Sequence, residues 1–472
     1  MSHKKLVKDT AIYAIGEIAP KIIGFFLLPV YTNYLSPADY GILSYTNSVV
    51  MFLFVFGALS LNTYVLRFYY EKKTEEEKRK LVGNVFLFIG FINLILFAVA
   101  FIIGPTITDK HNIQVPWKPY FQLALLNNLL ESFSILPLVF YRVRQNAKLF
   151  VTLSLSRTIL QFVLTFTFIV VLKQGLIGHY YGRLISLSLF VFIYWGIISK
   201  NTLLNFNLKQ IKEGLKFALP LVPGAIAYLL LSMSDRIILE RHVDIAQVGI
   251  YNVAFILAFA LSMIVQSGYR ALEPEFFKRF GQDGFFDFVR KIQSSFLFVV
   301  YVFALVLALF SQEIFLLLAS DEYYSGYKLV PIIIIGAIMT GQNVIFRTIL
   351  TAAKNTKAVG FSSFAGGLIS LFFNLSLIPI WGIYAAAISS AVSYFGMNIY
   401  LFVKMDFPSK SLKTEFFALG LYLIIAFSVI YYFNIQPSFP TFFLKLGLLG
   451  IYTLLLSRIF KIELLLDHAV KN

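Results

Sequence analysis

Long apolar runs alternate with short polar connections along almost the whole chain. About fourteen such runs occur, each roughly 20 residues long, which is the length that an α-helix needs to cross about 30 Å of hydrocarbon. Hydrocarbon offers no hydrogen bonds to the backbone, so runs of this kind must satisfy their own polar groups as helices. The pattern therefore predicts an all-α, polytopic membrane protein.

We expect these helices in two groups of six, followed by a final pair. The first group comprises 9–34, 40–69, 82–104, 117–141, 150–172 and 177–199. The second comprises 214–239, 247–269, 292–311, 327–350, 358–378 and 382–403, and the last pair is 415–433 and 442–460. The expected domains are an N-terminal bundle (1–199), an amphipathic cytoplasmic linker (200–213), a C-terminal bundle (214–405) and an additional helix pair with a cytoplasmic tail (406–472).

Lysine and arginine are concentrated in every second connection. Rich connections such as 72–80 and 278–291 alternate with poor ones that hold only single residues, such as Lys110 and Lys173. Because cytoplasmic loops retain basic residues, the alternation predicts that both termini are cytoplasmic. It also explains most of the formal charge of +16 through contact with anionic headgroups. No nucleic-acid partner is expected, since the charges are scattered over short loops.

Composition narrows the chemistry further. The chain is 58% hydrophobic and 14% charged, with a mean hydropathy of +0.78, and it has no cysteine and five scattered histidines. Disulfides and thiolate metal sites are excluded, and no phosphate-binding loop, zinc-ligand spacing or serine elbow occurs. We therefore expect no enzyme activity, no cofactor and no metal, and a transport process driven by an ion or product gradient.

Two regions repeat at an offset of about 208 residues. The segment YLSPADYGILSYT, which begins at Tyr34, matches RHVDIAQVGIYNVA, which begins at Arg241, and Gly41 falls on Gly249. RVRQNAKLF (142–150) matches TAAKNTKAV (351–359), and GLIGHYYGRLIS (175–186) matches PIWGIYAAAISS (379–390). Each copy holds an even number of helices, so both have the same orientation in the membrane. This predicts a parallel internal duplication, as found in some transporters.

The segment between the two copies has a basic amphipathic pattern. Leu204, Leu208, Ile211 and Leu215 recur at helical spacing among lysines. We expect a short helix with its apolar face on the inner leaflet; the alternative is a simple linker.

The duplicated segments also carry a resemblance. The stretches LPVYTNYLSPADYGILSY (28–45), SDRIILERHVDIAQVGIYNVA (234–254) and WGIYAAAISSAVSY (381–394), together with the asparagine-lysine turns at 146–148 and 355–357, resemble the MOP superfamily. The match is best to its polysaccharide transporter branch, the Wzx-type flippases of O-antigen and capsule. The resemblance implies a MATE-like fold, with two six-helix bundles in a V around a cavity, and an extra helix pair.

The resemblance further implies a function and its partners. The expected substrate is an undecaprenyl-diphosphate-linked oligosaccharide, moved from the inner to the outer leaflet of a bacterial cytoplasmic membrane. H⁺ or Na⁺ is the expected coupling ion, membrane lipids surround the protein, and glycan polymerase or ligase enzymes are further candidate partners. The alternatives are a MATE-like exporter of organic cations and a flippase for lipid II-type peptidoglycan precursors.

Ionisable residues inside the apolar runs are the candidate functional residues, because each is costly in hydrocarbon. Glu17 and Lys21 lie one helical turn apart in the first run. They form either an internal ion pair or a pair that opens when a substrate phosphate binds Lys21, which leaves Glu17 free to take a proton. Pro20 and Pro29 in the same helix permit it to bend.

Arg157 lies about 15 Å into the fifth run and has no carboxylate one turn away. It requires either an anionic ligand or a partner on another helix, and Glu131 in the fourth run is such a partner. Glu131 is also a candidate for ion coupling. Arg183, beside His179, Tyr180 and Tyr181, indicates a basic and aromatic patch in the outer half, although tyrosines also mark membrane interfaces.

The remaining candidates lie near helix ends. Asp235 is a candidate for ion coupling, or with Arg236 for a structural contact. Arg67, Arg270 and Arg347 either extend to the inner membrane surface or line a vestibule for a lipid diphosphate, because guanidinium groups bind phosphate in a bidentate way. The deep residues are basic rather than acidic in excess, which favours an anionic substrate over a cationic drug.

Overall fold

The computed structural model describes residues 3–405 and 410–460, and for some residues of the first, eighth and thirteenth membrane helices it describes the backbone alone. The described chain is helical, without strands. Twelve of its helices are long and apolar enough to cross a membrane, and two shorter apolar segments, Ile22–Tyr34 and Phe417–Tyr432, lie where the first and thirteenth helices are expected. The prediction of an all-α, polytopic membrane protein is confirmed.

The chain forms two compact units. Unit 1 consists of Met1–Leu229 with Asp244–Gly249, and unit 2 consists of Leu230–Val243 with Ile250–Asn472. This division places the region between the repeats, the start of α10 and Asp244–Gly249 in unit 1; the expected domain boundaries stay a prediction. Two helices are shared between the units: α10 (Val222–Leu239) and α11 (Ile245–Arg279) each begin in unit 1 and continue in unit 2.

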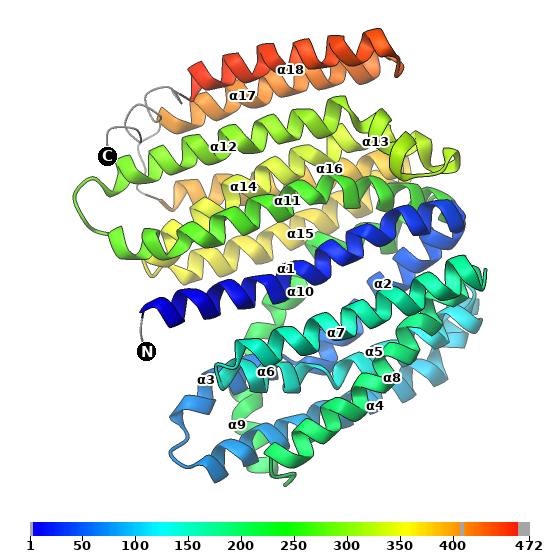
Figure 1. The fold of residues 1–472 in the computed structure, drawn as a ribbon, viewed down its shortest axis with the longest axis vertical. Helices are drawn as coiled ribbons and strands as arrows, with labels where there is room; N and C mark the ends of the chain where they lie inside the picture. Colours follow the sequence, from blue (N-terminus) through cyan, green and yellow to red (C-terminus); the bar gives the residue numbers. More distant parts are fainter. Residues whose placement is uncertain (1–2, 406–409, 461–472) are drawn as a thin grey trace. The chain divides into compact units, whose positions relative to one another are not determined.

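Unit 1 contains the first six expected membrane helices and the connecting helix (Figure 1). Its elements are α1 (His3–Tyr34), α2 (Pro37–Ala58), α3 (Leu61–Phe68), η1 (Tyr69–Glu71), α4 (Glu75–Lys110), η2 (Trp117–Phe121), α5 (Gln122–Ser132), α6 (Ile135–Val143), α7 (Ala147–Phe166), η3 (Thr167–Val171), α8 (Gly175–Asn201), α9 (Leu208–Ala218) and η4 (Leu219–Leu221).

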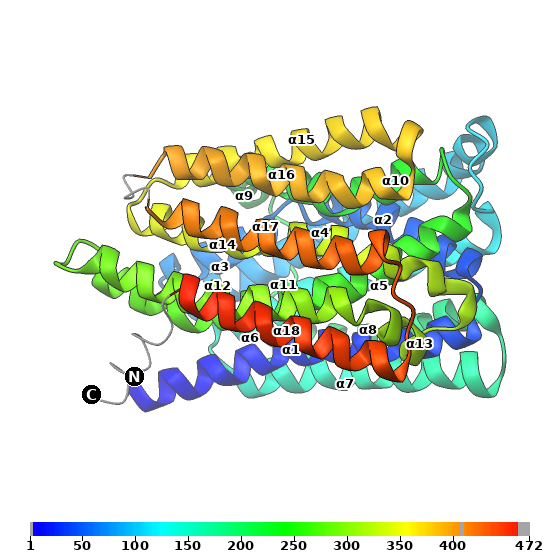
Figure 2. The same ribbon diagram turned by 90° about the horizontal axis from the view of Figure 1, so that it is seen from above.

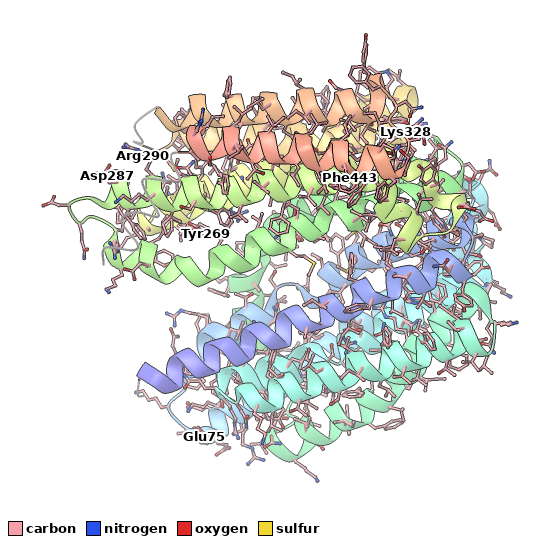
Figure 3. All side chains as sticks on the ribbon, turned by 45° about the horizontal axis from the view of Figure 1, so that its top comes forward. Glu75, Tyr269, Asp287, Arg290, Lys328 and Phe443 are labelled. Carbon is pink, nitrogen blue, oxygen red and sulfur yellow. The ribbon has the colours of Figure 1, made fainter. Side chains whose placement is uncertain are left out.

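Unit 2 contains most of α10 and α11 and the remaining helices. These are α12 (Phe285–Leu309), α13 (Ser311–Leu318), η5 (Asp321–Lys328), α14 (Val330–Ala352), α15 (Thr356–Trp381), α16 (Ile383–Val403), α17 (Lys410–Phe427), η6 (Ser428–Tyr432) and α18 (Phe439–Ile459). Figure 2 shows α12 and α14–α18 running along nearly the same direction. Asp287 and Arg290 lie at one end of this unit and Lys328 near the other (Figure 3), as the expected topology requires.

The second expected helix is interrupted near its C-terminal end. It was expected as one element over 40–69, but α2 ends at Ala58 and α3 begins at Leu61. Leu59 and Ser60 between them have positive φ angles of 46° and 55°, a conformation that no regular helix allows. Next to the break, the amide of Asn93 donates to the Gly57 carbonyl oxygen over 3.2 Å. A polar contact from α4 thus satisfies a backbone group next to the break.

Part of the apolar face of the connecting helix α9 packs on protein. Ile211 and Ala218 on its apolar face are buried in a cluster with Leu61, Tyr64 and Leu81. The side-chain amide of Asn84 also donates to the Asn207 carbonyl oxygen over 3.0 Å, at the start of α9. α3 and α4 thus cover part of its apolar face, whereas Leu204 and Leu208 are exposed. That these exposed apolar side chains lie on the inner leaflet stays a prediction.

The duplicated turns have the same local structure in both units. Gln145 before α7 and Lys354 before α15 both adopt left-handed φ angles, 54° and 60°. The next residue, an asparagine in each case, caps the helix: Asn146 accepts from the Leu149 N–H and Asn355 from the Ala358 N–H. Matching caps at matching positions are the structural counterpart of the sequence repeat.

Candidate functional site

Three charged side chains from different helices meet inside unit 1. Arg157 on α7 donates through Nη1 to Glu131 Oε2 on α5 over 2.6 Å. Arg183 on α8 brings its Nη2 to 3.7 Å from the same carboxylate oxygen. The three side chains are only 19–24% exposed. One carboxylate and two guanidinium groups leave the cluster with a net charge of one positive, and we call it the Glu131 cluster.

The backbone of unit 1 places these three residues together. The Asn146 cap fixes the start of α7, so that Arg157 comes about 15 Å along the helix. On α8, a Cβ at Gly182 would lie 2.7 Å from the Thr165 backbone nitrogen, so α8 and α7 approach as closely as a glycine permits. The Ser186 hydroxyl then donates to the Arg157 carbonyl oxygen over 3.2 Å. This tight crossing brings Arg183 to the Arg157–Glu131 pair.

The Glu131 cluster retains unused hydrogen-bond donors. Ser134 donates to Glu131 Oε1 over 3.3 Å, which adds a further donor to the carboxylate. Among the described residues, the buried Nε of Arg157 and the buried hydroxyl of Tyr194 have no hydrogen-bond partner. An uncompensated positive charge with free donors is an arrangement suited to an anion.

A second polar layer lies one turn before Arg183, toward the start of α8. His179 Nδ1 is 2.8 Å from the Tyr31 hydroxyl on α1, and the Tyr180 hydroxyl is 2.6 Å from Thr46 on α2. Both residues are buried, whereas Tyr181 is 39% exposed. The tyrosines therefore divide: Tyr180 belongs to the polar interior of unit 1, and Tyr181 suits the membrane interface.

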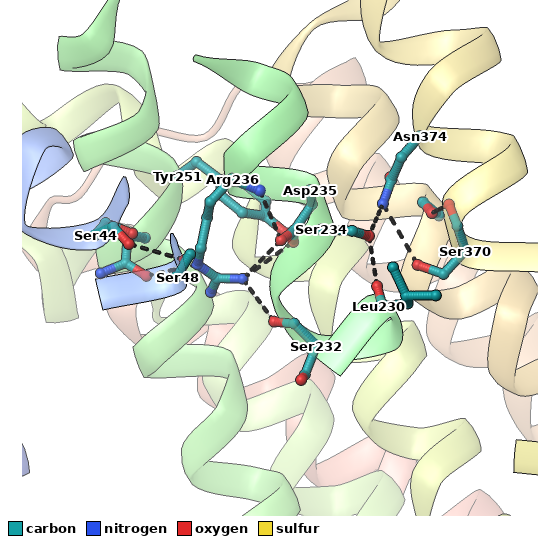
Figure 4. A network of polar contacts seen from close by, with 12 residues as sticks. Ser44, Ser48, Leu230, Ser232, Ser234, Asp235, Arg236, Tyr251, Ser370 and Asn374 are labelled. Atoms are coloured by element: carbon teal, nitrogen blue, oxygen red, sulfur yellow. Dashed lines mark hydrogen bonds and ion pairs between the residues drawn. The ribbon is translucent and has the colours of Figure 1, made fainter. Parts of the chain in front are cut away.

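In unit 2, Asp235 and Arg236 form an ion pair with each other (Figure 4). Arg236 Nη1 donates to Asp235 Oδ1 over 2.9 Å and to the Ser232 carbonyl oxygen over 2.9 Å. The Tyr251 hydroxyl donates to Asp235 Oδ2, and the Arg236 guanidinium lies 4.2 Å from the centre of the Phe255 ring. This is a buried, internally neutral network, so an ion-coupling role for Asp235 would require it to open.

The other candidates do not join the Glu131 cluster. Arg67 is 61% exposed and pairs with Glu71, four residues along the chain, over 2.7 Å. Arg347, on α14, is partly buried, and no described carboxylate lies within ion-pair distance of it. Glu17, Lys21 and Arg270 lie outside the residues whose side chains the structure describes.

One buried charge escaped the sequence reading. Lys445, near the start of α18, is fully buried and donates to both oxygens of Glu313 on α13, over 2.7 and 2.9 Å. It also donates to Gln312 Oε1 over 3.1 Å. A single lysine hardly lowers the mean hydropathy of a span, so this residue did not stand out. The feature that could have revealed it is a lysine within an apolar run. This pair attaches the last helix to α13.

No group of three or more His, Cys, Asp or Glu side chains among the described residues has the arrangement of a metal site.

The fold defined by these elements is shared with known transporters. A lipid II flippase, MurJ, in an inward closed conformation has a TM-score of 0.73 at 19% identity, over 96% of this chain and all of that one. An inward-facing multidrug resistance MATE transporter of the MOP superfamily has a TM-score of 0.62 at 13% identity, over 83% of this chain and 98% of that one. The molecule thus has the fold of MOP-superfamily transporters.

Sequence relatives identify the branch. An uncharacterised membrane protein of Methanocaldococcus jannaschii is 24% identical over all of this chain and 98% of its own length. The Lsg locus putative protein 1 of Haemophilus influenzae is 23% identical over 59% of this chain and 67% of its own. The family described as polysaccharide biosynthesis protein matches residues 6–280, more than half of the chain. The protein belongs to this family, within the polysaccharide transporter branch of the MOP superfamily.

Proposed function

We propose that this protein flips undecaprenyl-diphosphate-linked oligosaccharide from the inner to the outer leaflet of a bacterial cytoplasmic membrane. It does so by alternating access, coupled to an ion gradient, for the synthesis of O-antigen, capsule or exopolysaccharide. The protein acts as a transporter, not an enzyme. The observation that carries the proposal is the Glu131 cluster, a site with one net positive charge and free donors inside a membrane helix bundle.

The chemistry of the cluster suits a lipid diphosphate. Each guanidinium binds phosphate oxygens with two parallel N–H donors, and Arg157 and Arg183 offer two guanidinium groups to one headgroup. A diphosphate that takes Arg157 competes with Glu131, which then loses its strongest donor. The released Glu131 carboxylate could then take up a proton, which would link substrate binding to proton binding. Arg347 is a candidate for a further phosphate contact, and Lys21, Arg270 and Arg67 remain candidates for the entry path.

The test is a complementation assay for surface glycan in a host that lacks its own flippase, with membrane levels of the protein checked. Arg157→Ala should abolish the surface glycan, because the headgroup loses its deepest guanidinium. Arg157→Lys should retain part of the activity, since charge remains without the fork geometry. Arg290→Ala is the matched control, because Arg290 is an exposed arginine paired with Asp287 three residues away. Full activity of Arg157→Ala at normal expression would contradict the proposal.

Two further assays, for drug resistance and for rescue of cells depleted of their lipid II flippase, separate the alternatives. A MATE-like exporter of organic cations would confer drug resistance, and a cationic substrate is repelled by the net positive charge of the Glu131 cluster. A flippase for lipid II-type precursors would rescue cells depleted of their own lipid II flippase. Surface glycan without drug resistance and without that rescue is the expected outcome.

The orientation of the chain can be tested independently. The chain has no cysteine, so single cysteines report without background. Cysteines at Ser36 and Asn112, both exposed, should react with an impermeant maleimide added to intact cells, and those at Thr74 and Gln282 should not. Labelling at Thr74 and not at Ser36 would reverse the orientation and place both termini outside.

A further inference from the structure

A polar cavity lies in unit 1, between the start of α4 and the start of α9. Its volume is about 260 Å³, which is room for a phosphate group and several waters, because each water takes about 30 Å³. Its charged lining residues are three lysines and two glutamates: Lys72, Lys80, Lys209, Glu77 and Glu213. None of the three residues of the Glu131 cluster lines it. The cavity is therefore a separate site with its own charge.

Two of the lysines at this cavity are not neutralised by a neighbour. The Glu77 carboxylate accepts from two backbone N–H groups just before α4, over 3.0 and 3.4 Å, and Lys80 pairs with Glu76. Lys72 and Lys209, in contrast, have no described carboxylate within ion-pair distance. Each of these ammonium groups carries three hydrogen-bond donors and no acceptor. The cavity therefore offers two free positive charges to an anion.

One wall of the cavity, the segment 203–207, is fixed on α4. The Leu203 N–H donates to a backbone carbonyl oxygen of α4 over 3.2 Å. The Asn84 side chain donates to the Asn207 carbonyl oxygen over 3.0 Å and accepts from the Asn207 N–H over 3.1 Å. A Cβ at Gly83 would lie 2.2 Å from the Leu203 carbonyl oxygen, so the segment lies directly on the helix backbone. A ligand would thus find this wall already ordered, which favours binding.

The same segment has a polar side and an apolar side. Asn207 has extended backbone angles, φ −121° and ψ 102°, and successive side chains of an extended backbone point to opposite sides. The odd-numbered positions line the cavity: Asn205, Asn207 and Lys209. The even-numbered positions are apolar and 41–60% exposed: Leu204, Phe206 and Leu208. Exposed apolar side chains therefore lie directly beside a positively charged cavity.

From these observations we propose that the cavity binds the phosphate headgroup of an anionic phospholipid. Lys72 and Lys209 bind the phosphate, and the exposed apolar side chains beside the cavity suit the acyl chains. A soluble phosphate compound would use the same lysines but would leave those apolar side chains in water. The cavity lies among the basic connections, on the side where anionic lipids attract lysine and arginine. The site goes beyond the proposed function, because it does not depend on the transported substrate.

The test is a titration of the purified full chain with phosphatidylglycerol, with bound lipids counted by native mass spectrometry. The parent should bind one lipid more tightly than the others. Lys72→Ala with Lys209→Ala should raise the Kd of that lipid about tenfold or more, because both free charges at the cavity are lost. Lys212→Ala with Lys216→Ala is the matched control, since both lysines are exposed on α9, carry the same charge and do not line the cavity. Its Kd should stay within about twofold of the parent.

Two further ligands separate the headgroup from the acyl chains. Phosphatidylcholine, whose headgroup has no net charge, should bind the parent and both double variants alike. Glycerol phosphate, which has the phosphate without acyl chains, should not displace phosphatidylglycerol from the parent at equal concentration. Displacement by glycerol phosphate would mean that a soluble phosphate occupies the cavity, and would overturn the lipid assignment.

Thermal unfolding without added lipid checks that each variant folds. If the cavity double variant does not fold, Lys209→Ala alone decides, with Lys212→Ala as its control, and a Kd about threefold or more above that of the control is expected. Equal affinities for phosphatidylglycerol in the cavity variant and its control would overturn the site.

Discussion

Two hairpins correspond in the repeat: α7 with α8 in unit 1, and α15 with α16 in unit 2. They begin with the same cap, but their interior side chains differ. Both start with a left-handed residue and an asparagine cap. Inside, the position of Arg157 is taken by Gly366 and that of Arg183 by Ala387. In unit 2, Gly366 packs against Met397, and Ala387 is buried. The comparison teaches that the repeat preserves turns and caps, whereas the buried charge of the Glu131 cluster is confined to the first copy.

The largest expected effect is on the cluster itself. Glu131→Gln leaves two guanidinium groups without their carboxylate, and breaking a buried ion pair costs about 3–5 kcal/mol. Thr340→Val, at the corresponding position in unit 2, removes only a hydroxyl that bonds its own helix at Gly336, and should cost about 1 kcal/mol. Thermal unfolding of the purified variants measures both. Similar losses in the two variants would show that the charge in unit 1 makes no difference.

A somewhat smaller effect is expected for the ion pair of unit 2. Lys445→Met leaves Glu313 and Gln312 without their donor and should destabilise the protein by about 3 kcal/mol. Replacing both charges, in Lys445→Met with Glu313→Leu, should recover most of the lost stability. Two apolar side chains then pack where the single variant leaves an unpaired carboxylate. The double variant should therefore unfold at a higher temperature than the single one. The reverse order would mean that Glu313 is stable without Lys445.

The next effect in size is expected from added side-chain volume at Gly366 in unit 2. A Cβ at Gly366 would lie 2.2 Å from the Met397 sulfur, so Gly366→Val should cost about 1–3 kcal/mol through overpacking. Met397→Ala in the same chain makes room and should reduce the cost of the valine. The double-mutant cycle reports this coupling from melting temperatures. Additive effects would show that the two helices do not meet at this glycine.

The smallest effect is expected for the asparagine caps that the two hairpins share. Asn146→Ala and Asn355→Ala each remove one helix cap and should each cost about 1 kcal/mol. Asn146→Asp and Asn355→Asp keep an acceptor and should be nearly neutral. Unequal losses between the two alanine variants, measured side by side by thermal unfolding, would show that the caps are not equivalent.

The sequence predicted the membrane helices well, because each must supply about 20 apolar residues whatever its neighbours are. It also provided Glu131 as a partner for Arg157, since a deep arginine requires compensation. It did not predict that Arg183 joins them, because that depends on the rotation of α8 and on its close approach to α7 at Gly182. Periodicity alone likewise did not show that part of the apolar face of α9 packs on α3 and α4, since a leaflet and a neighbouring helix select the same pattern.

The net charge of the Glu131 cluster has an electrical consequence. Membrane voltage does work of about 2.3 kcal/mol on each elementary charge for every 100 mV that the charge crosses. In a cell that is negative inside, the field pushes an anionic lipid headgroup outward. The same field draws the emptied, positively charged site back toward the cytoplasm. While Glu131 stays ionised, the loaded site is negative overall, because one net positive charge faces the two negative charges of a diphosphate. Both half-steps of the proposed cycle then run downhill in voltage, so flipping should speed up as the membrane is hyperpolarised.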